Sequence, residues 1–201
     1  MSSRPRPFLL DLTERLERIS LLDGPANALV GRVRAAIPEG PVRQTLRGDA
    51  LGHALHPLLT DLPIGTWTSS IVLDFLGGKS SRRAADTLIA VGILSYLPAA
   101  ASGASDWSER TEPGPARRVG LVHAAANLGA LGLFTSSLLH RARGRRARGR
   151  VLSLAGAAAL GLGGYLGGHL SLVRAVGVEA DPTQSTAPAS SAEPPYAPPL
   201  H

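Results

Sequence analysis

The sequence predicts an all-α fold, an integral membrane four-helix bundle that follows amphipathic helices and precedes a disordered tail. The main observation is that residues 87–105, 119–139 and 151–173 contain no Asp, Glu, Lys or Arg. At about 1.5 Å per residue, each of these runs is long enough to cross about 30 Å of hydrocarbon. Core helices of soluble proteins rarely extend so far without a charge, so a soluble helical bundle is the weaker interpretation.

A fourth span is predicted at residues 57–76, although Asp61 and Asp74 interrupt its apolar run. This segment is the only apolar partner that precedes the other three spans. With it, the transmembrane domain covers residues 51–178, and successive helices alternate in direction across the bilayer.

Residues 1–50 are predicted to form an amphipathic helical lead-in. Glu14 and Arg18 form a favourable i, i+4 pair, and Asp23-Gly24-Pro25 ends one helix and starts another. The apolar stripes are Leu9, Leu12, Leu16 and Ile19 in the first helix, and Leu29, Val33 and Ile37 in the second. These helices are expected to lie on the bilayer surface or to cover the end of the bundle, and a solubilising lead-in without a role of its own is an equal alternative.

The C-terminal residues 179–201 contain six prolines, few large apolar residues and no periodicity. Such a segment cannot bury enough apolar surface to fold, so a disordered tail is predicted.

Basic residues predict the orientation of the chain. The loops 77–86 and 140–150 lie on one face and carry nine Lys and Arg residues, whereas six arginines lie near the span ends on the other face. The positive-inside rule therefore places these loops in the cytoplasm and both termini outside the inner (plasma) membrane. MSSRPRPFLLDLTER does not match a signal peptide, because Asp11 and Glu14 interrupt its apolar core.

The high isoelectric point, about 10.9, raises the question of nucleic acid as a partner. Six of the arginines, however, fall in HRARGRRARGR (residues 140–150) between two spans, and no RNA- or DNA-binding motif accompanies them. A lipid-facing, juxtamembrane role is the simpler interpretation, and it makes the lipid bilayer the expected partner.

Several classes of chemistry lack support in the sequence. The absence of cysteine excludes disulfides, cysteine-ligated iron–sulfur clusters and cysteine zinc sites. No nucleophile elbow, P-loop, dinucleotide-binding fingerprint or His-Glu-x-x-His motif is present, so no enzyme class is predicted.

Histidines of three different spans are predicted to meet at one end of the bundle. Asp61 and His123 each lie four residues inside the start of a span, and His169 lies four residues before the end of one. Antiparallel neighbours bring these positions to one depth, where ionisable side chains are costly unless they are paired or bound to a ligand. The predicted cofactor-binding residues are His56, Asp61, Asp106, His123, Asn127 and His169.

Three interpretations of this cluster stay open. The favoured one is a redox module with one b-type haem, held axially by His123 and His169 with His56 as the alternative ligand, beside glycines that either make space for a macrocycle or only let helices pack closely. The second is a zinc or non-haem iron site with His56, His123 and His169 as ligands, completed by Asp61 or Asp106. The third is a membrane anchor or scaffold without a cofactor, in which the polar residues lock the end of the bundle.

Four segments resemble the bacterial membrane protein family known as domain of unknown function 2231. They are LGHALHPLLTDLPIGTWTSSIVLDFLG (51–77), SGASDWSE (102–109), RRVGLVHAAANLGALGLFTSSLLHR (117–141) and LGGYLGGHL (162–170), within a resemblance that covers about residues 8–178. It implies four transmembrane helices but supplies no reaction. The residues on the family's pattern are His56, Pro57, Asp61, Pro63, Gly65, Asp106, His123, Asn127, Gly168 and His169.

Some members of that family continue into a Rieske-type iron–sulfur domain, which implies electron transfer. This chain instead ends in a cysteine-free tail. An iron–sulfur or other redox partner would therefore be a separate protein.

Overall fold

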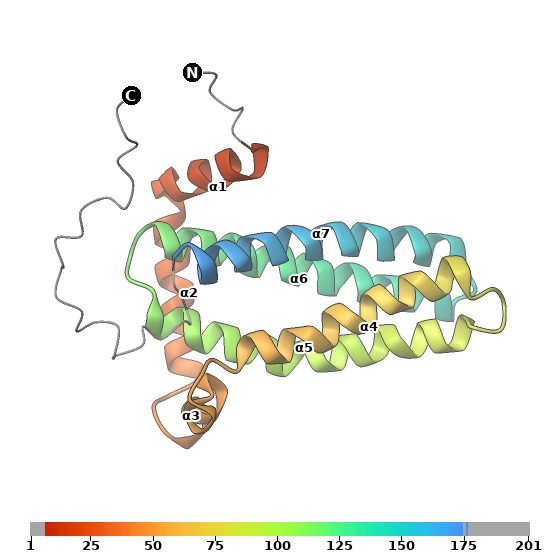
Figure 1. The fold of residues 1–201 in the computed structure, drawn as a ribbon, viewed down its shortest axis with the longest axis horizontal. Coiled ribbons are helices and arrows are strands. Elements are labelled where there is room, and N and C mark those ends of the chain that lie inside the picture. Colours follow the sequence, from red (N-terminus) through yellow and green to blue (C-terminus); the bar gives the residue numbers. More distant parts are fainter. Residues whose placement is uncertain (1–6, 175, 177–201) are drawn as a thin grey trace, which may run out of the picture.

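The computed structural model describes residues 7–174 and 176, which are helical with no strand among them. The helices are α1 (Phe8–Arg18), α2 (Asp23–Ala36), α3 (Pro41–Arg47), α4 (His56–Leu76), α5 (Arg82–Arg110), α6 (Pro115–Ala142) and α7 (Arg146–Leu172), with 3-10 turns η1 (Ser20–Leu22) and η2 (Asp49–Leu51). The long helices α4 to α7 run side by side, and α1, α2 and α3 gather at one end of them (Figure 1). The predicted tail at 179–201 lies outside the described residues.

Three helices, α5, α6 and α7, are long and apolar enough to cross a membrane. Only 22% of the most apolar window of each helix is buried inside the structure. Helices α5 and α6 extend beyond their predicted uncharged runs at both ends, whereas α7 begins before its run but ends at Leu172. The extensions contain the flanking arginines. Helix α4 matches the predicted segment 57–76 closely in its bounds but is not among the three.

The long helices pack as neighbours around a core. Helix α4 packs against α5 and α7, and α6 also packs against α5 and α7, which places α4 and α6 on a diagonal. Trp67 of α4 reaches the centre, stacks on Phe134 with ring centroids 4.4 Å apart, and donates a hydrogen bond of 3.2 Å to the carbonyl of Ile89. Gly92 permits this approach, since a Cβ there would overlap the Trp67 indole.

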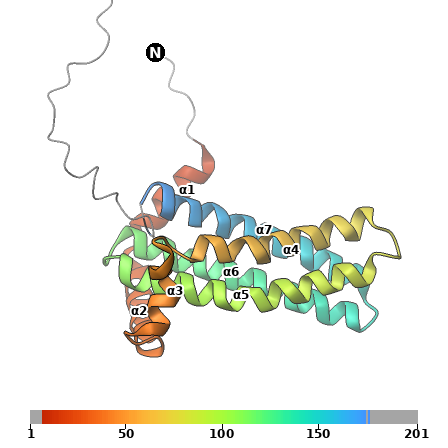
Figure 2. The same cartoon turned by 60° about the horizontal axis from the view of Figure 1, so that its bottom comes forward.

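The N-terminal helices cover one end of this assembly (Figure 2). Helix α1 packs against α6, α2 against α5 and α6, and α3 against α5. Arg34 of α2 donates to the Ser108 carbonyl, and Arg118 of α6 forms an ion pair with Asp23. The two predicted lead-in helices are present as α1 and α2 and contact the end of the bundle. Helix α3 was not predicted, although Pro41 after Gly40 is a helix-start signal.

A buried ion cluster closes the opposite end of the long helices. Arg141 of α6, whose side chain is 0% exposed, makes a bidentate pair with Asp74 of α4 and a second ion pair of 3.2 Å with Asp86 of α5. From α7, Arg146 pairs with Asp86 at 2.6 Å and Arg150 with Asp74 at 3.6 Å. The prediction that all arginines of residues 140–150 face lipid is therefore wrong for these three, because two aspartates from other helices draw them inward.

Candidate functional site

Two of the predicted histidines form a pair inside the assembly of long helices. His56 is the first residue of α4, and His123 lies in the third turn of α6. Their ring centroids are 6.3 Å apart with an interplanar angle of 83°. Because α4 and α6 are diagonal neighbours, the two imidazoles approach each other across the centre, with α5 and α7 on the two sides.

A backbone carbonyl holds each ring. The Nδ1 atom of His56 lies 2.8 Å from the Ala99 oxygen of α5, and that of His123 lies 2.8 Å from the Gly163 oxygen of α7. A carbonyl oxygen only accepts hydrogen bonds, so Nδ1 carries the proton in both rings. Each Nε2 atom therefore keeps its lone pair, which is the arrangement found in metal-ligating histidines whose other nitrogen donates to a carbonyl.

Glycines of α5 and α7 make room for the pair. A Cβ atom at Gly103 would lie 2.6 Å from the His56 ring, and one at Gly167 would lie 2.9 Å from the His123 ring. A Cβ atom at Gly163 would likewise lie 2.6 Å from the Asn127 side chain. Gly164 and Gly168 have nothing within 4 Å of such an atom. The glycine-rich face of α7 thus divides into a stripe that receives α6 side chains and a stripe that is open.

The other predicted polar residues divide between the pair and the surface. The Asn127 amide nitrogen lies 3.2 Å from His123 Nε2 and donates to the His123 carbonyl at 2.9 Å. Asp106 is buried 3.5 Å from Arg110, with one carboxylate oxygen that makes no hydrogen bond among the described residues. Asp61 is exposed on α4.

His169 lies in a different contact. Its Nε2 atom is 2.9 Å from a Glu17 carboxylate oxygen of α1, and Arg174 binds the same carboxylate. Within the described residues, no group of three His, Asp or Glu side chains is placed to hold a metal ion. The structure therefore does not bring the three predicted ligands His56, His123 and His169 together as one such group. Helix α7 turns about 100° per residue, so His169 and Gly167 face different neighbours.

The Glu17 contact ties α1 to the end of α7. Burial alone would raise the pKa of Glu17, but hydrogen bonds from Arg174 and His169 outweigh it and hold the pKa below its ordinary value of 4.5. The pKa of the Arg174 guanidinium is correspondingly raised by its hydrogen bond to Glu17. The docking of α1 therefore depends on an ionised carboxylate.

Acid is expected to weaken this contact. Because the folded pKa of Glu17 is lowered, its stabilisation is fully present above pH 4.5 and is lost as the pH falls through the folded pKa. At pH 6, Glu17→Gln is expected to lower the free energy of unfolding by about 1 kcal/mol, since Arg174 is partly exposed to solvent. Thermal unfolding of both proteins over a pH series checks this, and the difference should vanish at the acid end. Glu14→Gln, which removes a looser pair at 4.0 Å on the same helix, serves as the control.

Sequence reasoning missed an ion cluster that joins α3 to the end of α5. Glu109 of α5 receives ion pairs from both Arg43 and Arg47 of α3. Hydrogen bonds to Asp49 and Glu109 raise the pKa of Arg47, so its guanidinium stays charged. Arg43, Arg47 and Glu109 are visible in the sequence as charged residues near the ends of spans. More than sixty positions separate Glu109 from the two arginines, so nothing local indicates that they pair.

The described residues are helical without a strand, and three of their helices are long and apolar enough to cross a membrane, which is the character of an integral membrane protein. A family model described as predicted membrane protein DUF2231 matches residues 52–180, and the chain belongs to that family. The match begins near the start of α4, so it leaves out α1 to α3, which the predicted range of 8–178 included. No curated protein and no solved structure matches the chain.

Proposed function

We propose that this protein is a membrane redox module that binds one b-type haem through His56 and His123. The observation that carries the proposal is the pair itself. Its centroid separation of 6.3 Å is about the span of two imidazoles on opposite sides of one metal ion, given a metal–imidazole bond of about 2 Å. Both Nδ1 atoms are already bound to carbonyls, so Nε2 is the atom of each ring that would ligate. At His123, the Asn127 amide nitrogen, which lies 3.2 Å from Nε2, would have to give way to the metal.

The number of protein ligands favours haem over a divalent ion. Zinc and non-haem iron sites usually need three or four protein ligands, whereas haem brings its own equatorial nitrogens and needs only axial ones. Two imidazoles meet here, and the described residues offer no third His, Asp or Glu. Gly103 on α5 and Gly167 on α7 lie directly against the two rings and add no side-chain bulk there.

The packing of the core favours electron transfer over ion transport as the function. Between the histidine pair and the ion cluster at Arg141, the centre is filled by stacked Trp67 and Phe134 together with Ile89. An ion would have no polar path through this packing. His56 and His123 would hold the haem between them, and the group would then supply electron transfer, with a separate iron–sulfur or other redox protein as the partner.

The membrane arrangement forms part of the proposal. Helix α4 serves as a fourth span, because it packs beside α5 and α7 along the same axis and closes the ring of helices (Figure 1). The basic loops at 77–86 and 140–150 then lie in the cytoplasm, at the plasma membrane. The histidine pair lies toward the outer side, at the end of the long helices that α1, α2 and α3 cover.

The second candidate is a membrane anchor without a cofactor. It is supported by the closeness of Gly103 and Gly167 to the rings, because the imidazoles themselves fill that space. In that case the pair only fixes the packing of α4 and α6.

Absorption spectroscopy distinguishes the two candidates. The full chain is produced in haem-replete cells, purified in detergent, and examined for a Soret band and for iron by elemental analysis. The expected result is a band in the parent protein that is lost in His56→Ala and in His123→Ala. His169→Ala is the matched control, since it also removes a buried α7 imidazole but only breaks the contact with Glu17, and it should keep the band.

Two results would contradict haem binding. One is colourless, iron-free parent protein from replete cells, which leaves the anchor function. The other is a band that survives His56→Ala and His123→Ala but disappears in His169→Ala, which would restore His169 as a ligand.

A further inference from the structure

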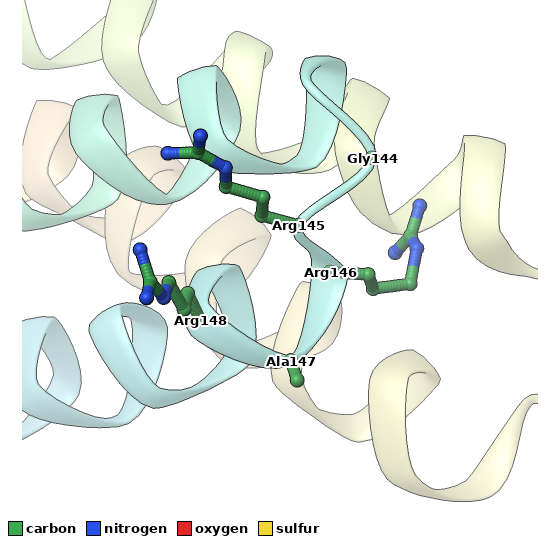
Figure 3. A pocket seen from close by; sticks show the side chains of 5 residues that line it. All are labelled: Gly144, Arg145, Arg146, Ala147 and Arg148. Carbon is green, nitrogen blue, oxygen red and sulfur yellow. The ribbon is translucent and has the colours of Figure 1, made fainter.

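The turn between α6 and α7 presents arginines that the ion cluster does not use. Arg143, Arg145 and Arg148 are exposed, and the described part of the chain provides no side-chain partner for them. Figure 3 shows Arg145 and Arg148 extending to one side of the turn and Arg146 to the other, toward the aspartates that it binds. An open pocket of about 420 Å³ lies along residues 144–148.

The acidic groups at this end are already occupied. Asp74 and Asp86 bind Arg141, Arg146 and Arg150, so they leave no carboxylate for the three exposed arginines. The neighbouring α4–α5 loop and the first turn of α5 add the exposed basic residues Lys79, Arg82 and Arg83. The carboxylate that follows in α5 is that of Asp86, which is already paired. The surface therefore carries an uncompensated positive charge that fits an anionic partner.

The position of the turn identifies the anion. Three candidate spans start or end here, which places the exposed arginines at the depth of lipid headgroups. Directly along α7, Val151 and Leu154 are 65% and 46% exposed, and they offer an apolar surface below the charges. A molecule with a phosphate above and acyl chains below matches both features, whereas a free phosphate matches only the first.

We propose that the α6–α7 turn binds an anionic phospholipid, with its headgroup phosphate held by Arg143, Arg145 and Arg148 and its acyl chains lying on α7. This site is at the opposite end from the histidine pair and does not depend on any cofactor there. It would couple the packing of α6 and α7 to the lipid composition of the bilayer.

Lipid titration of the full chain in detergent, read by native mass spectrometry, tests the proposal. Phosphatidylglycerol should bind clearly more tightly than phosphatidylcholine. Each basic residue near an anionic headgroup contributes roughly fivefold in affinity, so the triple variant R143Q/R145Q/R148Q should bind phosphatidylglycerol about a hundredfold more weakly. The single variants should each lose roughly fivefold, which keeps the test valid if the triple variant does not fold.

Two control variants test whether a loss of lipid affinity comes from the charge at this turn. R15Q/R18Q/R32Q removes three exposed arginines from α1 and α2 and should leave the affinity unchanged. The lysine triple variant R143K/R145K/R148K keeps the charge and should retain most of the affinity. Equal binding of phosphatidylglycerol by the parent and the glutamine triple would overturn the site. Equal binding of inorganic phosphate and phosphatidylglycerol at the turn would overturn the assignment to a lipid.

Discussion

Asp74→Asn is expected to lower the free energy of unfolding by about 3–5 kcal/mol, because it leaves the Arg141 guanidinium charged and buried without its main partner. The Arg141 side chain is 0% exposed and that of Asp74 2% exposed, so water cannot replace the lost carboxylate. Ser137 and Ser153 remain within hydrogen-bond distance but supply no charge. Asp86 contacts Arg141 through a single ion pair of 3.2 Å, in contrast to the bidentate pair that Asp74 makes. Equilibrium unfolding in mixed micelles measures the difference.

A double-mutant cycle separates the interaction energy of the Asp74–Arg141 pair from nonspecific effects of each substitution on stability. Asp74→Asn leaves the Arg141 charge without its main partner, and Arg141→Met removes that charge. The double variant should therefore be clearly more stable than the sum of the two single losses predicts. Asp61→Asn, an exposed position on the same helix, should change stability little. Additive losses in the cycle would show that the two residues do not form the buried pair.

Trp67→Ala is expected to cost about 3 kcal/mol of stability, because it opens a large cavity in the core between the long helices. The indole is 0% exposed and stacks on Phe134. In a lipid environment the removed group does not gain from water, so the loss comes from van der Waals contacts and the cavity itself, which places it at the low end of the range for such truncations. Unfolding in the same micelles measures it.

The control for this truncation lies on the same helix. Leu76 is 82% exposed, and Leu76→Ala should change the free energy of unfolding by less than about 1 kcal/mol. If Trp67→Ala were equally mild, the central packing that separates the histidine pair from the ion cluster would be absent. The transport function that this packing argues against would then need to be considered again.

The candidate site could be predicted only in part. Counting residues from the ends of the apolar runs indicates depth, and the depth argument placed His56 and His123 at one end, where the structure pairs them. Depth does not give the rotation of a helix about its own axis. His169 therefore entered the predicted set at a similar depth, whereas in the fold it faces Glu17 of α1.

The ion cluster shows the same limit at the other end. In the sequence, Arg141 belongs to a run of arginines beside a span, and nothing local separates it from Arg143 or Arg145. Asp74 lies 67 positions away and reaches Arg141 only when α4 and α6 are assembled. Which arginines remain for lipid follows from that pairing.

The sequence by itself determined the helical class and the three membrane-crossing segments, because length and the absence of charge are local properties that act along a single helix. It also indicated α1 and α2 through the periodicity of their apolar residues. Only the tertiary structure decided which imidazoles meet, which arginines are neutralised, and which glycines lie against a ring. Those contacts join residues far apart in the chain, so they depend on how each helix is rotated and packed, which no local pattern specifies.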